Sequence, residues 1–411
     1  IRAETQRHGA AASEYIKVRR ILREWYAHFR DVRDDKNGEL IRRITLLVGG
    51  EILNKYIDAG KKSMYIPRDN LHMLYKEYGD GILTEIIIDK IKRREIDFPY
   101  KKYMISSGEL EGCISYIKSF TGSEISDRDY ELRDVTFSEG FRDIWENPLL
   151  LKPDNRYTTF IHTDMEYQKI DYITDYFTEG ERMKARRVDS SVEKSPYEIW
   201  TEGLPIVTEI LVDSMTKVLG GKNDVLTPKI LRDAIYESSK REGGVKEATQ
   251  FKISLVISVL RRFLSDPSTS SVLDISAGWG DRLIGAICSN VANYVAFDPN
   301  TNLREGHRGI IDHFARDRKE RFKVIYEPFE KGGLPSGIEY DLVFTSPPFF
   351  DLEVYTDAEG QSLANYSDGR GWLVNFLFAS LKKAWGALKE GGHMVIHITD
   401  SGSLQICEPM V

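Results

Sequence analysis

The clearest pattern along the chain is an alternation of short apolar runs with amphipathic stretches in the carboxyl-terminal half. The runs are bounded by glycine, proline or polar residues and contain many β-branched and aromatic residues, which predicts strands. Between them, apolar residues recur every three or four positions, which predicts helices. The predicted strands are Ser271–Ile275, Tyr294–Phe297, Lys323–Tyr326, Tyr340–Thr345 and His393–Thr399. The predicted helices are Ile253–Phe263, Arg282–Ser289, Leu303–Arg316 and Trp372–Leu388, the last ending at Gly391-Gly392.

Strands that alternate with helices predict an α/β fold, a doubly wound Rossmann-like sheet whose strand-following loops share one edge. The amino-terminal half instead has helical periodicity without strands. Its predicted helices are Val18–Val32, Leu71–Tyr78 and Leu83–Lys92, and two more, Val207–Leu219 and Lys229–Lys240, precede the sheet. A charged stretch around Asp171–Trp200 has the composition of a hinge. We therefore expect a mostly helical domain over residues 1–200 and a sheet domain over residues 201–411.

Composition narrows the class of protein. The net charge of −7 over 411 residues argues against nucleic-acid binding through bulk charge, so any such binding must be local. The clusters that offer it include Lys92, Arg93 and Arg94, and then Arg182, Lys184, Arg186 and Arg187. The three cysteines have neither paired nor metal-ligand spacing, so we expect no disulfide and no metal site. A reducing intracellular compartment, cytoplasm or nucleus, fits this usage, and no apolar stretch is long enough to span a membrane.

Two features at the sheet edge predict a nucleotide-like ligand. After the first strand comes DISAGWGD, in which Ser276, Ala277, Gly278 and Gly280 let the backbone approach a ligand closely. After the second strand comes Asp298, placed where a carboxylate can accept both hydroxyls of a ribose. Asp274, at the end of the first strand, is expected to face the same ligand. The loop lacks the G-x-G-x-x-G spacing of dinucleotide dehydrogenases, and the chain has no P-loop.

The fourth strand ends in Thr345-Ser346-Pro347-Pro348-Phe349-Phe350. Prolines cannot donate to a sheet ladder, so this segment must form a stiff loop at the carboxyl edge. Oxygen atoms held rigidly there are suited to accept hydrogen bonds, and an aromatic ring beside them offers a flat face for stacking. The loop is therefore a candidate catalytic site.

Together, DISAGWGD, FDPN and TSPPFF resemble the motifs of class I S-adenosylmethionine-dependent methyltransferases. More narrowly, they are similar to the amino-methyltransferases with an (Asp/Asn/Ser)-Pro-Pro-(Tyr/Phe/Trp) loop, and SPPFFDLEVY resembles phage and large-virus DNA methylases. The resemblance covers about residues 245–400. It implies that Phe251 and Lys252 pack on the methionine moiety of S-adenosylmethionine and that Thr345 lies at the cofactor site. The family sheet continues into a terminal hairpin, so we expect the carboxyl end to be incomplete or replaced.

The resemblance implies transfer of a methyl group to the exocyclic amine of a base in DNA, adenine N6 or cytosine N4. Ser346 and the Pro347 carbonyl, held rigid by Pro348, would accept hydrogen bonds from the amine, and Phe349 would stack on the base. Ser346 in place of Asp or Asn does not decide between the two bases. Cytosine-C5 methylation is excluded, because that reaction needs a nucleophilic cysteine and no cysteine here follows a proline.

Other functions stay open from the sequence. The same chemistry can act on RNA, for example at a cap-adjacent adenosine, or on a protein glutamine side chain. The chain can also be a catalytically silent subunit that binds nucleic acid, although an intact glycine loop and an intact Pro-Pro loop favour an active enzyme. Nucleic acid, DNA rather than RNA, is the expected partner, and the sequence does not predict an oligomeric state.

Overall fold

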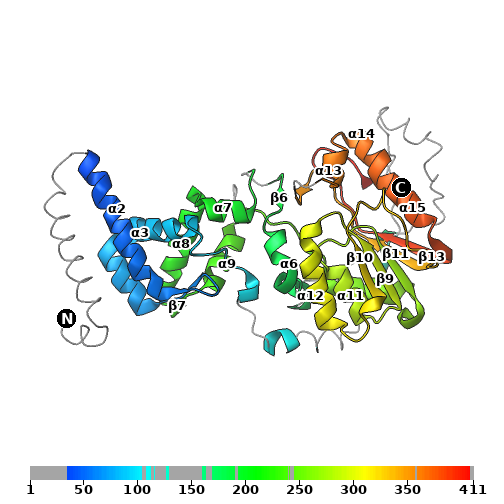
Figure 1. The fold of residues 1–411 in the computed structure, drawn as a ribbon, viewed down its shortest axis with the longest axis horizontal. Coiled ribbons are helices and arrows are strands. Elements are labelled where there is room, and N and C mark those ends of the chain that lie inside the picture. The colour runs from blue at the N-terminus through cyan, green and yellow to red at the C-terminus, as the bar shows by residue number, and fades with distance from the viewer. Residues whose placement is uncertain are drawn as a thin grey trace. The chain divides into compact units, whose positions relative to one another are not determined.

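A computed structural model describes residues 35–103, 108–112, 115, 126–128, 160–162, 169–189, 193–238, 240, 245–356 and 359–407. The chain divides into two compact units. The first contains residues 1–99 and 197–238, and the second contains residues 100–196 and 239–411. Figure 1 shows the elements of each unit. Among the described residues, no helix has the length and apolar character needed to cross a membrane.

The first unit is built mainly of helices. They are α2 (Asp35–Leu53), α3 (Arg68–Lys92), α7 (Pro196–Glu202), α8 (Pro205–Leu219) and α9 (Pro228–Ser238). Short pieces connect them: η1 (Asn54–Tyr56), β1 (Ile57–Asp58), β2 (Ser63–Met64), β3 (Ile66–Pro67) and β7 (Val225–Leu226). Two predicted helices form the single element α3, which is kinked where Gly79 adopts a φ of 73°. The predicted helix Val18–Val32 lies outside the described residues.

The second unit contains a five-stranded parallel sheet in the order β10-β9-β8-β11-β13. Its strands are β8 (Ser271–Asp274), β9 (Asn293–Phe297), β10 (Phe322–Ile325), β11 (Tyr340–Thr345) and β13 (Leu388–Ile396). Counted along the chain, this is the order 3-2-1-4-5, in which the direction of the connections reverses beside the first strand. The structure confirms the predicted α/β fold, a Rossmann-like sheet with a helical amino-terminal region.

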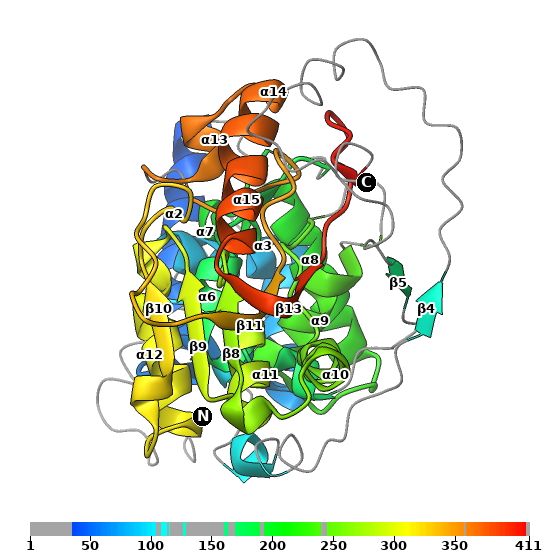
Figure 2. The ribbon, with the colours of Figure 1, turned by 90° about the vertical axis from the view of Figure 1, so that its right-hand side faces the viewer.

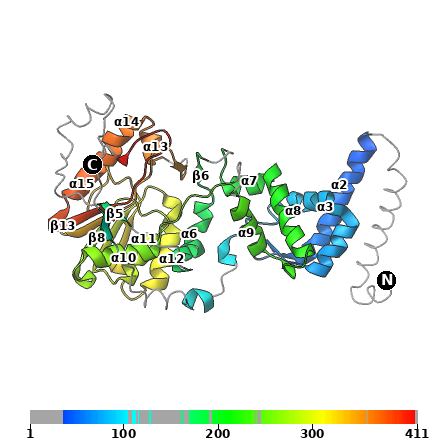
Figure 3. The same ribbon diagram turned by 180° about the vertical axis from the view of Figure 1, so that it is seen from behind.

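Helices cover both faces of the sheet, as Figures 1, 2 and 3 show. On one face lie α10 (Ile253–Phe263), α11 (Asp281–Cys288) and α12 (Arg304–Phe314). On the other lie η8 (Trp372–Phe378), which is π-helical, and α15 (Ala379–Trp385). Successive strand residues point to opposite faces, so Val272 and Leu273 belong to different cores. Because both faces of the inner strands are buried, β8, β9 and β11 read as nearly continuous apolar runs.

The remaining elements of the second unit are short. They are η2 (Lys101–Tyr103), β4 (Ser126–Arg128), β5 (Phe160–His162), η4 (Lys169–Tyr172), α6 (Asp175–Arg182), β6 (Arg186–Arg187), η5 (Pro267–Thr269), η6 (Thr301–Leu303), η7 (Lys319–Arg321), β12 (Glu353–Val354), α13 (Ser362–Asn365) and α14 (Gly369–Gly371). β6 pairs with β12 in an antiparallel ladder, Glu353 opposite Arg187. This ladder joins the segment that follows the Pro-Pro loop to the chain around residue 187.

The structure differs from the sequence predictions at two boundaries. Residue 200 does not separate the two units, because residues 169–189 belong with the sheet and residues 197–238 belong with α2 and α3. Buried hydrogen bonds explain why residues 169–189 belong with the sheet, because Ser254 of α10 donates from its backbone amide and its hydroxyl to Asp171. Gly391 and Gly392 lie inside β13 rather than at a helix end, where the register with β11 is irregular and Gly391 has a φ of 76°.

Candidate active site at the carboxyl edge of the sheet

The glycine loop after β8 turns tightly between the sheet and α11. Gly278 and Gly280 have φ values of 58° and 97°, in the left-handed region that glycine adopts without steric cost. A Cβ atom on Gly280 would lie 2.6 Å from Ile310 Cδ1, so this glycine is needed for close packing on α12. Gly278 has no such close neighbour, since its nearest atoms lie at 3.8 Å. Gly278 is therefore the position where the loop backbone stays open to a ligand.

Asp274 supports this loop from beneath. Its side chain is fully buried and accepts hydrogen bonds from Arg282 Nε at 2.7 Å and from the Tyr294 hydroxyl at 2.8 Å. It also accepts from the Ser276 amide at 3.1 Å and from the Thr345 hydroxyl at 2.9 Å. Four donors satisfy the carboxylate. The side chains of Asp274 and Thr345 are both buried and hold the loops in place, and their expected position at the cofactor site stays a prediction.

Asp298 and Asn300 follow β9 on the other side of the glycine loop. The Asp298 carboxylate accepts from the backbone amides of Gly278 at 2.8 Å and Asn300 at 2.9 Å. Burial raises the pKa of Asp298 to about 6, although both hydrogen bonds lower it. Asn300 Oδ1 accepts from the Asn302 amide, whereas the buried Asn300 Nδ2 has no hydrogen-bond partner among the described residues. Asp298 thus retains two further acceptor sites on its carboxylate, and Asn300 retains a free amide donor.

The Pro-Pro loop is fastened to the glycine loop. The Ser276 hydroxyl donates to the Ser346 carbonyl at 2.8 Å, and its oxygen lies 2.8 Å from the oxygen of the Thr345 hydroxyl. The Ser346 hydroxyl shares a hydrogen bond of 3.2 Å with His397 Nδ1. Desolvation and the positive charge of Arg282 lower the pKa of His397 although the residue as a whole is exposed, and this favours a neutral ring near pH 7. A neutral Nδ1 can accept the serine hydroxyl hydrogen and leave the serine oxygen free to accept from a substrate.

The two phenylalanines of the loop have different surroundings. The ring of Phe349 lies 6.0 Å from the His397 ring and is partly buried. Phe350 is 8% exposed, packs on Trp372 at 5.6 Å and has a φ of 53°, a left-handed backbone that is unusual for a bulky residue. Phe350 therefore anchors the loop in the core, and Phe349 is the ring available at the site.

Phe251 and Lys252 lie just before α10. The Phe251 ring meets His397 edge-on at 5.0 Å and Phe344 at 5.7 Å, and the Arg282 guanidinium lies 5.3 Å from its centre. The structure thus brings Phe251 to the same edge as the glycine loop and the Pro-Pro loop. Lys252 is partly buried and occupies the position that precedes the helix.

Segment 169–189 braces the glycine loop, which the sequence did not predict. Thr178 donates to the Trp279 carbonyl at 2.8 Å, and Thr174 donates to the Asp281 carboxylate. Burial raises the pKa of Asp281 to about 7. The Trp279 ring meets Tyr355 edge-on at 5.7 Å. Thr174 and Thr178 recur at helical spacing in the sequence, but nothing in that pattern identifies their distant partners.

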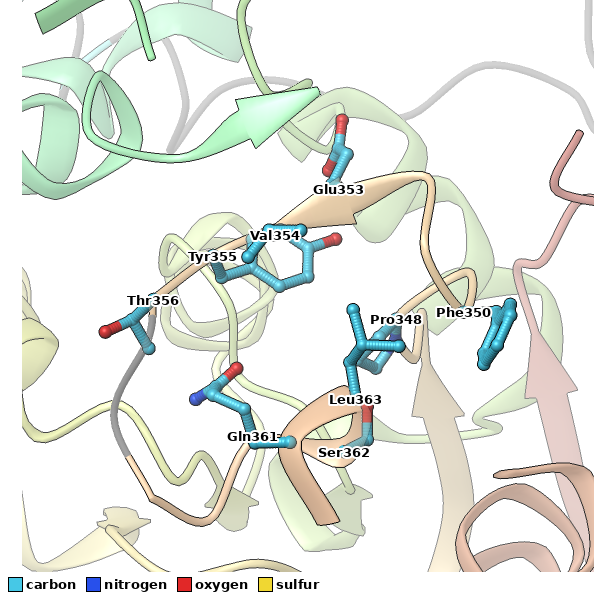
Figure 4. A pocket seen from close by; sticks show the side chains of 10 residues that line it. Pro348, Phe350, Glu353, Val354, Tyr355, Thr356, Gln361, Ser362 and Leu363 are labelled. Atoms are coloured by element: carbon cyan, nitrogen blue, oxygen red, sulfur yellow. The ribbon is translucent and has the colours of Figure 1, made fainter. Parts of the chain in front are cut away.

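A cavity of about 210 Å³ lies between the Pro-Pro loop and the segment after it. Figure 4 shows Pro348 and Phe350 on one side, β12 above, and the beginning of α13 below. Its lining consists of Pro348, Phe350, Glu353, Val354, Tyr355, Thr356, Gln361, Ser362, Leu363 and Ala364. The volume corresponds to about seven waters of liquid, enough for one flat heterocycle and below the usual range for drug-sized ligands.

The predicted nucleic-acid contacts near residue 185 need correction. Arg182 is 3% exposed and its guanidinium donates to Asp175, Glu247 and the Ala248 carbonyl, so it is a structural residue. Arg187 pairs with Asp189 and Glu353 and donates to Thr249. Lys184 is exposed and pairs with Glu181 at its surface, and Arg186 is partly buried. A charge run in a sequence does not reveal which of its members fold inward.

Lys92, Arg93 and Arg94, in the first unit, are exposed. Arg93 pairs with Asp89 within α3, and Arg94 donates to the Tyr197 hydroxyl at 2.8 Å. Among the described residues no group of His, Cys, Asp and Glu has the arrangement of a metal site.

No protein-family model and no curated protein matches the chain. Solved structures similar to it include an rRNA methylase from Streptococcus thermophilus, at 14% identity and a TM-score of 0.27, covering 38% of this chain and 76% of that one. The glycopeptide N-methyltransferase MtfA complexed with S-adenosylmethionine matches at 14% identity and a TM-score of 0.25, covering 35% of this chain and 48% of that one. A putative methylase from Haemophilus influenzae matches at 14% identity and a TM-score of 0.27, covering 37% of this chain and 74% of that one. These scores are low, and the fold assignment rests on the sheet itself.

Proposed function

We propose that this chain is an S-adenosylmethionine-dependent methyltransferase that acts on the exocyclic amine of a base in DNA, adenine N6 or cytosine N4. One observation carries the proposal: the Ser276 hydroxyl binds the Ser346 carbonyl and so fastens the glycine loop to the Pro-Pro loop. A cofactor on the first loop and an amine on the second would meet at one edge of the sheet, where doubly wound folds bind ligands.

The residues after β8 and β9 fit the cofactor. The open backbone at Gly278 can approach it, Asp298 retains acceptor sites for the two ribose hydroxyls, and Asn300 Nδ2 is a buried donor without a partner among the described residues. Phe251 offers an apolar surface beside these groups. When bound, the cofactor supplies an activated methyl group, and the protein's task is to orient the amine towards it.

The amine needs activation because its lone pair is delocalised into the ring of the base. Acceptors that bind both amine hydrogens draw the nitrogen towards tetrahedral geometry and free the lone pair. The Ser346 carbonyl already accepts from Ser276, which favours the Ser346 hydroxyl oxygen as one acceptor, oriented by neutral His397. The Pro347 carbonyl would be the other, and Phe349 would stack on the base.

The proposed role of Asp298 predicts a pH dependence of cofactor affinity. The ribose hydroxyls donate, so they bind the ionised carboxylate, which is fully present above its pKa of about 6 and is lost as the pH falls through that value. Affinity by calorimetry should be about tenfold weaker at pH 5 than at pH 7. Asp298→Ala should weaken binding by about tenfold or more at pH 7 and remove most of the dependence. The exposed Asp317, changed to alanine, is the control; an Asp298→Ala variant with parental affinity contradicts the assignment.

Nucleic acid is the proposed partner, with DNA favoured over RNA. The exposed cluster Lys92, Arg93 and Arg94 and the exposed Lys184 supply local positive charge on an acidic protein. Phosphate contacts from such side chains position a strand without reading its sequence. A base in a duplex would be turned out of the stack to reach the Pro-Pro loop.

The test is nucleoside mass spectrometry after incubation of the protein with labelled cofactor and separate DNA and RNA pools. Label on adenine N6 or cytosine N4 of DNA supports the proposal. Label on RNA alone favours an RNA methyltransferase, and label on protein glutamine favours that substrate instead. Cofactor binding without transfer to any pool favours a silent nucleic-acid-binding subunit.

A further inference from the structure

Gln361 is an unexplained polar residue in the wall of the cavity described above. It is 8% exposed, and its Nε2 atom has no hydrogen-bond partner among the described residues. It stands at the N-cap position of α13, yet its side chain makes no capping hydrogen bond. A buried donor without a partner is costly and rare in folded proteins. The carboxamide in the cavity wall therefore has a free hydrogen-bond donor that a ligand in the cavity could use.

The rest of the cavity limits what can bind there. Pro348, Phe350, Leu363 and Ala364 give it apolar walls, and its volume suits a single flat ring system. Pro348 is the residue of the Pro-Pro loop that lines the cavity, together with Phe350 just after it, so a ring that enters the cavity lies beside that loop. Figure 4 shows that Gln361 lines the cavity from a different segment than Pro348 and Phe350. A ring held between them would lie beside the Pro-Pro loop on one side and beside Gln361 on the other.

We propose that Gln361 is a specificity-determining residue that reads the target base, and this rests on the proposed function. Its amide donates to an unprotonated ring nitrogen beside the exocyclic amine, which is N1 or N7 in adenine and N3 in cytosine. Glutamine is one of the side chains that pair with the amine and N7 edge of adenine in DNA complexes. The contact pairs the donor and places the amine against the acceptors of the Pro-Pro loop.

The test combines Gln361→Met, which keeps the side-chain length and removes the amide, with a substrate that lacks the ring nitrogen. Oligonucleotides carry the methylated base or its deaza analogue: 7-deazaadenine and 1-deazaadenine for an adenine enzyme, 3-deazacytosine for a cytosine enzyme. For the parent, one deaza analogue should lower kcat/KM about ten- to a hundredfold. Gln361→Met should show the same loss on the natural base and no further loss on that analogue.

Two further measurements separate this role from a structural one. Because Nε2 has no partner to lose, Gln361→Met should keep the parental melting temperature or exceed it, and cofactor affinity should not change. The exposed Gln405, changed to methionine, is the matched control and should be neutral in every assay.

Deaza effects of the same size in the parent and in Gln361→Met overturn the inference, as does a lowered melting temperature with an unchanged rate. Either result leaves the proposed function intact, because the parent still methylates the natural base. A parent that methylates no base in any pool removes the proposed function, and the inference falls with it.

Discussion

Replacing Arg182 with glutamine is expected to lower the free energy of unfolding by about 3–5 kcal/mol, the cost of breaking a buried ion pair from one side. Asp175 is fully buried, Glu247 is largely buried, and both bind the Arg182 guanidinium. Asp175 keeps its ion pair with Lys101 after the change, but both carboxylates lose the buried guanidinium between them. Burial opposes the charged form of Arg182, but the neighbouring carboxylates outweigh it and raise the pKa of the guanidinium. Urea denaturation followed by circular dichroism measures the loss.

Lys184 provides the matched control, because it lies two residues further on and its pair with Glu181 is exposed. Lys184→Gln should change stability by less than about 0.5 kcal/mol. If Arg182→Gln is as mild as Lys184→Gln, the buried network does not stabilise the unit. A lower affinity for DNA in Arg182→Gln would then not be attributable to unfolding, and the original expectation of a phosphate contact would regain support.

Ser346→Ala is expected to slow methyl transfer by roughly a hundredfold while cofactor affinity stays nearly constant. The hydroxyl is proposed to accept from the amine mainly in the transition state, and contacts of that kind appear in the rate rather than in ground-state binding. The hydrogen bond that joins residue 346 to the glycine loop is accepted by its backbone carbonyl, which alanine retains. Single-turnover kinetics with labelled cofactor measures the rate, and calorimetry measures the affinity.

The exposed Ser336, changed to alanine, controls for a general effect of removing a hydroxyl from the same unit. Phe349→Ala should weaken the hold on the base by about 1–3 kcal/mol, which appears in KM. A Ser346→Ala, Phe349→Ala double variant that methylates at the parental rate would show that the Pro-Pro loop is only a structural turn.

The sheet could be predicted because its signals are local. β11 has the predicted bounds, Tyr340–Thr345, since two prolines stop the ladder immediately afterwards, and α10 likewise matches Ile253–Phe263. The strands that lie between α10 and β11 in the chain, which are β8, β9 and β10, differ from the predicted bounds by no more than one residue at either end. Each of these elements is specified by its own apolar run and the turn residues beside it.

The candidate site could be predicted only in part, because its supports are distant in sequence. Ser276 and Ser346 are seventy positions apart, and Thr178 meets Trp279 across about a hundred. Asp274 is buried among donors of the chain itself, which the sequence does not reveal, since a carboxylate at a strand end looks the same whether it faces ligand or protein. The contact between His397 and Ser346 likewise appears only once β11 and β13 are neighbours.

Phe350 makes the shape of the Pro-Pro loop depend on a distant helix. A left-handed backbone at a phenylalanine costs of order 1–3 kcal/mol. The two preceding prolines fix their own φ angles and do not offset this cost at Phe350. What holds the turn is the ring against Trp372, at the start of a helix that forms more than twenty residues later in the chain. The isolated loop would relax to another shape. The arrangement proposed for catalysis therefore depends on η8 being docked on the sheet, and local opening of that helix would abolish it without any change at Ser346 itself.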